Sequence, residues 1–215
     1  DLTVPFARFV VMNQSALSFP FKRYQIQPVW RGDRPGRGRY QEFYQCDVDV
    51  VGSDSLINEV ELIQIFDEVL SNLSIPNFKI KLNNRKILAG LAEKIGAGDK
   101  MTEMCVAIDK LDKIGEEKVK EELQQRGFEA EQIDGLSPVF ALPNNTKAAL
   151  EMMSDTLAGN ALGEKGLEEL RYVLSRCEQL GVAQESLEFD PLLARGLNYY
   201  TGAIFEVKVE GASVG

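Results

Sequence analysis

The sequence predicts an α+β fold, and three observations support this prediction. Residues 24–31 and 43–50 alternate along the chain as half-buried strands do. Residues 88–180 instead show the helical spacing of apolar side chains, and residues 203–209 return to a strand pattern. We therefore expect an antiparallel sheet flanked by helices, with a helical subdomain inserted between its strands.

The first two strands are predicted to form a hairpin with a long basic tip. Residues 31–39 contain Pro35 and Gly36, which are typical of turns. Four arginines lie in the same nine positions: Arg31, Arg34, Arg37 and Arg39. The guanidinium group binds phosphate through two parallel hydrogen bonds, so this tip is a candidate phosphate-binding loop. The alternative interpretation is a solvated basic loop on an ordinary hairpin.

The second predicted strand places its acidic and amide side chains and one aromatic ring on the same face. Side chains alternate across a strand, so one face holds Phe43, Gln45, Asp47 and Asp49. The preceding strand is expected to contribute Gln25, Gln27, Val29 and Arg31. A ring, amides and carboxylates beside a phosphate-binding arginine suit a nucleotide together with a small molecule that carries an amine.

The remaining elements follow from caps and periodicity. Ser53, Asp54 and Ser55 are candidate caps for a helix that ends near Leu73, and residues 78–82 read as a half-buried strand. Further helices are expected at residues 116–126, 146–157 and 164–180. Two supporting ion pairs, Glu116–Lys120 and Glu122–Arg126, are expected on the first of these three helices.

Composition excludes several classes of protein. The chain of 215 residues has a net charge of −9, which argues against general affinity for nucleic acid, although a local cationic patch can still bind RNA. It has no histidine, which excludes Ser-His-Asp and Cys-His triads and any histidine-ligated metal. Cys46, Cys105 and Cys177 are far apart, so we expect neither a disulfide framework nor a zinc site, in keeping with a cytoplasmic protein. No apolar run or signal peptide points to a membrane.

Three segments resemble one family. Residues 38–49 (GRYQEFYQCDVD) are similar to motif 2 of class II aminoacyl-tRNA synthetases, in the version found in histidyl-tRNA synthetases. Residues 194–206 (ARGLNYYTGAIFE) resemble the histidine-specific motif of that family, and residues 1–8 (DLTVPFAR) resemble its segment ahead of motif 2. The resemblance implies a class II synthetase-like sheet with an inserted helical subdomain.

The resemblance also implies roles for individual residues. The catalytic residues would be Arg31 and Arg195, two cations on either side of the α-phosphate that stabilise charge as it develops. The histidine-binding residues would be Asp1, Leu2, Thr3, Gln45, Asp49, Tyr199 and Tyr200. Among these, Asp49 and Tyr200 would read the imidazole nitrogens. The ATP-binding residues would be Arg31, Asp33, Arg39 and Phe43, with the phenyl ring stacked on adenine. No metal site formed by protein ligands alone is expected.

The implied reaction activates histidine with ATP, in the presence of Mg²⁺, and transfers it to tRNA(His). We expect a homodimeric, cytoplasmic full-length protein with no membrane association. Residues 1–87 would form the catalytic core with motif 2, residues 88–185 the helical insertion and connecting helices, and residues 186–215 the return to the core.

The sequence departs from the family pattern in three respects, and two alternative functions stay open. Asp33 stands where many class II enzymes have glutamate, and Asn198 stands where the family usually has aspartate. Motif 1, motif 3 and an anticodon-binding domain are not recognisable, so we expect a catalytic-core fragment. The alternatives are non-catalytic paralogues: the regulatory subunit of ATP phosphoribosyltransferase, and the tRNA-sensing domain of a starvation-responsive kinase. Both are expected to lose parts of the substrate-binding set that this sequence retains.

Overall fold

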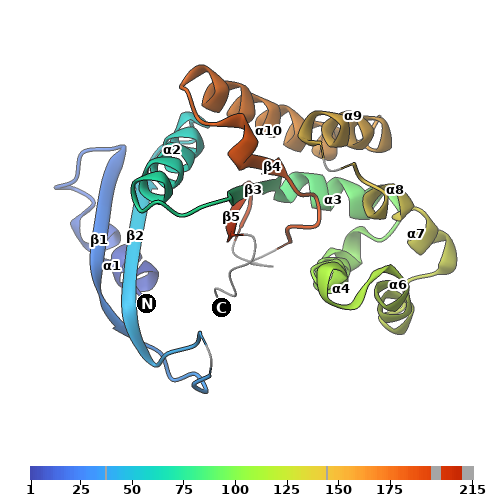
Figure 1. Cartoon of the computed structure of the whole chain (residues 1–215), viewed down its shortest axis with the longest axis horizontal. Coiled ribbons are helices and arrows are strands. Elements are labelled where there is room, and N and C mark those ends of the chain that lie inside the picture. Colours follow the sequence, from blue (N-terminus) through green and yellow to red (C-terminus); the bar gives the residue numbers. More distant parts are fainter. Residues whose placement is uncertain (37, 144, 195–199, 210–215) are drawn as a thin grey trace. The chain divides into compact units, whose positions relative to one another are not determined.

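The computed structural model describes residues 1–36, 38–143, 145–194 and 200–209. The described chain divides into two compact units, residues 1–58 and 59–209 (Figure 1). Both units combine helix with strand, so the predicted α+β class is confirmed. No helix in the described residues is long and apolar enough to cross a membrane.

The first unit is a hairpin with one helix. Strands β1 (Phe21–Trp30) and β2 (Glu42–Val51) pair antiparallel, which confirms the predicted hairpin and extends each strand by a few residues. The register places Gln27 opposite Gln45. Helix α1 (Thr3–Asn13) was not predicted, and its Pro5 lies in the first turn, where the missing N–H disrupts no helical hydrogen bond.

One face of this hairpin is apolar and largely uncovered within the described residues. Its side chains are between 38% and 78% exposed: Tyr24, Ile26, Trp30, Tyr44 and Val48. These positions alternate with those of the predicted substrate-binding face. We refer to these five residues as the outer face of the hairpin.

The second unit contains a three-stranded sheet with β3 (Phe78–Asn84) in the centre. Strand β5 (Ala203–Val209) pairs antiparallel with it, and the unpredicted strand β4 (Leu187–Phe189) pairs parallel with it. Ile80 and Leu82 of β3 are fully buried, as their alternation with lysines predicted. Both residues therefore anchor the sheet against the helices.

The four predicted helices are present: α2 (Ile57–Asn72), α6 (Glu116–Gln125), α9 (Thr146–Thr156) and α10 (Ala161–Gln179). The others are α3 (Arg85–Lys94), η1 (Gly98–Lys100), α4 (Met101–Ile108), α5 (Leu111–Ile114), α7 (Ala130–Asp134), α8 (Ser137–Phe140) and η2 (Gln184–Ser186). Helices α3, α9 and α10 contact this sheet, whereas α4, α6, α7 and α8 lie farther from it (Figure 1).

Two helix starts differ from the prediction. Helix α2 begins at Ile57, whose N–H donates to the Ser55 hydroxyl at 3.5 Å, while the Ser53 hydroxyl accepts the Ser55 N–H at 3.2 Å. Helix α10 begins three residues before the predicted Glu164, because the Asn160 side chain accepts the Gly163 N–H at 2.8 Å and caps the helix there. The two predicted ion pairs of α6 both form, at 2.6 Å each.

Helices α3 and α10 cross at glycines. A Cβ atom on Gly90 would lie 2.6 Å from the Cα atom of Gly163, and one on Gly166 would lie 2.8 Å from the backbone nitrogen of Ile87. Contacts this short leave no space for a methyl group, so the crossing requires glycine at these positions. This packing joins β3 and the helices in one unit, whereas the predicted limits of a separate insertion, residues 88–185, stay a prediction.

Candidate active site

The candidate site is built on the inner face of the hairpin in the first unit. Cross-strand pairs place Arg23 opposite Asp49, Gln25 opposite Asp47 and Val29 opposite Phe43. The alternation predicted for the return strand is therefore present, with the two carboxylates, the amide and the ring on the same face. Arg31 follows β1 directly, and its N–H donates to the Gln41 carbonyl at 2.9 Å, which holds it beside this face.

Helix α1 brings the amino-terminal residues to the same face. The Leu2 N–H donates to Oε1 of Gln45 at 3.2 Å, and the Leu2 side chain is buried. The Phe6 ring packs on Phe21, with 6.2 Å between centroids. Of the predicted histidine-binding residues in this unit, Leu2 and Gln45 are therefore in direct contact, and the buried Leu2 side chain anchors the start of the helix.

Asp1 and Arg31 form the charged centre of this arrangement. Nε of Arg31 donates to Oδ1 of Asp1 at 2.9 Å, and Nη2 lies 2.8 Å from the same oxygen. Both side chains are about half exposed, so the ion pair itself adds little stability. The guanidinium carbon of Arg31 also lies 4.9 Å from the centroid of the Phe43 ring. A carboxylate that can bind an ammonium group thus adjoins a cation that can bind phosphate.

A cavity of about 660 Å³ opens at the tip of the hairpin. The four predicted ATP-binding residues, Arg31, Asp33, Arg39 and Phe43, all line it. The tip keeps its shape through two backbone hydrogen bonds of 3.0 Å between Gly36 and Arg39, with Gly38 at a positive φ of 75°. Its dimensions and cationic lining suit a nucleoside triphosphate.

Burial is the main influence on the pKa of Asp49, which lies at the end of the inner face away from the hairpin tip. Burial raises the pKa of the Asp49 carboxyl above its ordinary value, the charge of Arg23 lowers it, and the charge of Asp47 raises it. Nη2 of Arg23 lies 2.7 Å from Oδ2 of Asp49. Arg23 was not among the predicted site residues. The strand alternation that placed Gln25 and Gln27 on this face, extended two residues towards the amino terminus, would have found it.

The other predicted residues lie elsewhere in the chain. Arg195, Tyr199, Asn198 and Arg37 are outside the described residues. Tyr200 belongs to the second unit, is 38% exposed and lies just before β5.

The turn that leads towards Arg195 is firmly held within the second unit. The buried Asn83 side chain donates to the carbonyls of Pro191 and Leu193, at 3.1 and 3.0 Å. Nζ of Lys81 lies 2.6 Å from Oδ2 of Asp190. Both contacts come from β3, so the central strand fixes the backbone that enters the histidine-specific motif.

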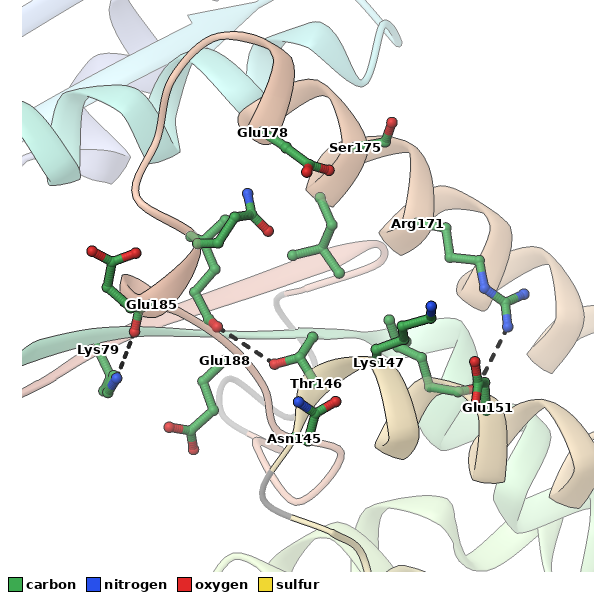
Figure 2. Close-up of a pocket in the computed structure, with 14 residues that line it drawn as sticks. Lys79, Asn145, Thr146, Lys147, Glu151, Arg171, Ser175, Glu178, Glu185 and Glu188 are labelled. Carbon is green, nitrogen blue, oxygen red and sulfur yellow. Dashed lines mark hydrogen bonds between the residues drawn. The ribbon is translucent and has the colours of Figure 1, made fainter.

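A second cavity, of about 850 Å³, lies between α9, α10 and β4 (Figure 2). None of the predicted site residues lines it. Three cationic and four carboxylate side chains line it, and Lys79 donates to the backbone carbonyl of Glu185 at 2.5 Å. Its volume is larger than that of the cavity at the hairpin tip. Its lining nevertheless mixes positive and negative side chains, so it does not select a ligand of one charge.

Metal-binding chemistry is limited in the described residues. They hold no group of three cysteines, aspartates or glutamates able to bind a metal ion together. Asp33 is a carboxylate in the cavity at the hairpin tip. Mg²⁺ commonly uses one or two carboxylates together with phosphate oxygens, so the chemistry of Asp33 is compatible with a magnesium ion held jointly with a bound phosphate.

Comparison with known proteins identifies the family. The profile of the histidyl-tRNA synthetase family matches residues 1–214. The histidine–tRNA ligase of Phocaeicola vulgatus is 56% identical over all 215 residues, which cover 47% of that protein. The crystal structure of histidyl-tRNA synthetase from Nostoc sp. PCC 7120 matches 97% of this chain and 48% of its own, with a TM-score of 0.88 and 34% identity.

A third relative shows the fold alone. An ATP phosphoribosyltransferase regulatory subunit/histidyl-tRNA synthetase from Bacillus halodurans gives a TM-score of 0.84 at 21% identity, covering 100% of this chain and 54% of its own.

The fold and the matched motifs define a class II aminoacyl-tRNA synthetase core. The chain belongs to the histidyl-tRNA synthetase family. It spans about half the length of the curated relatives it matches.

Proposed function

We propose that the protein containing this chain joins histidine to ATP as histidyl-adenylate and then transfers histidine to tRNA(His). The observation that carries this proposal is the cavity at the hairpin tip. Arg31, Asp33, Arg39 and Phe43 line it together, and Asp1 contacts Arg31 at its edge. A carboxylate suited to an ammonium group thus adjoins guanidinium groups suited to phosphate in one unit, and this arrangement supports the proposal.

The reaction needs no protein nucleophile. The carboxylate oxygen of histidine forms a bond to the α-phosphorus of ATP, the bond from that phosphorus to the bridging oxygen breaks, and pyrophosphate leaves with the electron pair. Arg31 would stabilise the additional negative charge on the α-phosphate. The absence of histidine from the chain is compatible with this, because a substrate carboxylate is ionised at neutral pH and no proton has to be removed.

Orientation is the other contribution of the site. Phe43 would stack on adenine, and Asp1 would bind the α-ammonium group, which holds the attacking oxygen close to phosphorus. Thr3, Gln45 and Asp49 would complete the amino-acid side. Asp33 would take one coordination position of the Mg²⁺ that accompanies ATP. The assignment of Arg195, Tyr199 and Tyr200 to the same substrate rests on the sequence motif.

Partners and location follow from the family. We propose tRNA(His) as the acceptor substrate, with Arg34, Arg37 and Arg39 facing either its acceptor end or the ATP phosphates. A homodimer in the cytoplasm is the expected form of the whole protein. The decisive experiment is ATP–pyrophosphate exchange with each of the amino acids in turn: exchange that requires histidine supports the proposal, and no histidine-dependent exchange contradicts it in favour of a non-catalytic paralogue.

Replacing Asp49 with alanine should selectively impair the use of histidine. A hydrogen bond to a charged group contributes about 1.5–3 kcal/mol, so the KM for histidine should rise about ten- to a hundredfold. The KM for ATP should change little, because Phe43 and the arginines remain. Steady-state exchange kinetics measure both constants, and Asp54→Ala, at an exposed loop position, is the control. Equal increases in both constants would show that Asp49 has no specific contact with histidine.

A further inference from the structure

Arg23 is held in one position by three different groups. Its Nη1 donates to Oε1 of Gln25 at 2.5 Å, its guanidinium carbon lies 4.1 Å from the centroid of the Phe6 ring, and its Nη2 lies 2.7 Å from Oδ2 of Asp49. The side chain is only 11% exposed. These contacts hold the guanidinium group in one orientation in the free protein. Less side-chain entropy is therefore lost on substrate binding than with a mobile surface arginine.

The contact with Asp49 is an ion pair with imperfect hydrogen-bond geometry. Nε and Nη2 of Arg23 and Oδ2 of Asp49 are buried, and none of these atoms has a regular hydrogen-bond partner among the described residues. Fully buried polar atoms usually have such partners, and the exceptions often lie at functional sites. The two side chains therefore interact mainly through their opposite charges, and less through a directional hydrogen bond.

Few charged groups act on Asp49. Arg23 acts from β1, and Asp47 acts from two positions earlier on β2. Helix α1, which packs on the same face, presents the Phe6 ring to Arg23, while its single cation, Arg8, is exposed. Arg23 is thus the positive charge that opposes both burial and Asp47 at this carboxylate.

We propose that Arg23 is a positioning residue of the histidine pocket, which holds Asp49 as an oriented carboxylate that accepts the N–H of the substrate imidazole. This inference rests on the proposed function. Arg23 engages Oδ2, so Oδ1 is the atom that would receive the imidazole N–H. A protonated Asp49 would present an O–H donor in place of one acceptor. The pocket would then no longer prefer the imidazole tautomer whose N–H points at Asp49.

The sign of the pH effect follows from the three influences on Asp49. Histidine use requires the carboxylate, so the KM for histidine rises as pH falls through the pKa of Asp49. Removing Arg23 removes the charge that lowers this pKa, while burial and Asp47 continue to raise it. The pH at which the KM begins to rise should therefore move upward. The imidazole of the substrate titrates identically with every variant, so a difference between two profiles reports the protein.

The experiment compares variants of the whole protein in histidine-dependent ATP–pyrophosphate exchange as a function of pH. Arg23→Gln should raise the KM for histidine about tenfold at neutral pH, leave the KM for ATP nearly unchanged and shift the histidine profile to higher pH. Arg23→Lys keeps the charge but cannot contact Asp49, Gln25 and Phe6 together, so it should raise the KM while leaving the profile in place. Lys22→Gln removes the same charge from an exposed position on the opposite face of β1 and is the matched control.

Each outcome either supports or overturns the positioning role of Arg23. A shifted profile in Arg23→Gln that Arg23→Lys restores supports the inference. Profiles that coincide with that of the unaltered protein, or equal losses for histidine and ATP, overturn it and leave Arg23 as a packing residue. If Arg23→Gln does not fold, the inference stands or falls on whether Arg23→Lys alters the KM for histidine without altering that for ATP. An unaltered protein without histidine-dependent exchange would instead refute the proposed function itself.

Discussion

Replacing Arg31 with alanine in the whole protein is expected to lower the rate of histidine-dependent ATP–pyrophosphate exchange by about a hundred- to a thousandfold. Removing one preorganised charge partner from a transition state typically costs that much. Arg31 adjoins both Asp1 and Phe43 and lines the cavity at the hairpin tip, so its loss removes the charge proposed to bind phosphate without creating a buried cavity.

Two further variants make this result specific. Arg31→Lys keeps the charge but loses the planar fork, so its rate should fall between those of the alanine variant and the unaltered protein. Arg8→Ala removes an exposed arginine from α1 and should leave the rate unchanged. An Arg31→Ala protein that folds and exchanges pyrophosphate at the normal rate would remove Arg31 from the mechanism.

Replacing Gly90 with alanine is expected to destabilise the second unit by about 1–3 kcal/mol, the usual cost of overpacking a close contact. In an ordinary helix this change stabilises by roughly 1 kcal/mol. At Gly90 the new methyl group would meet backbone atoms of Gly163 at 2.6 and 2.7 Å, and backbone cannot rotate away as a side chain can. Helices α3 and α10 would have to separate.

Thermal unfolding of the whole protein measures this effect, as a lower midpoint for the transition that involves this unit. Gly98→Ala is the control, because its methyl group would meet only the Cγ and Cα atoms of Glu93, at ordinary contact distances of 3.4 and 3.9 Å. A Gly90→Ala protein that unfolds at the normal temperature or above would show that the two helices can shift apart at no cost.

Local patterns predicted the parts of this fold whose neighbours are close in sequence. The hairpin faces followed from strict alternation around Gln45, and the ion pairs of α6 followed from a spacing of four residues. Helix α1 was missed because its apolar residues are not arranged in a clear amphipathic stripe. Strand β4 is three residues long and pairs across a separation of over a hundred residues, so no local pattern marks it.

The candidate site was predicted to a similar extent. The ATP-binding set at the hairpin tip came from the order of residue types in one motif, and the structure brings those four side chains to one cavity. Arg23 was missed because the first strand was predicted to begin at Tyr24, whereas β1 begins at Phe21 and its alternation places Arg23 on the face of Asp49. The requirement for glycine at position 90 depends on a partner more than seventy residues away.

The outer face of the hairpin has a consequence for the chemistry on its reverse. Trp30 is 65% exposed and immediately precedes Arg31, and Tyr44 is 71% exposed and immediately follows Phe43. Two-stranded ribbons twist readily, and an uncovered aromatic surface of this kind attracts a covering layer. A contact made on Trp30 and Tyr44 would therefore act on the same two strands that position Arg31 and Phe43. Under the proposed function, a contact on the outer face would therefore alter ATP binding from the opposite side of the hairpin.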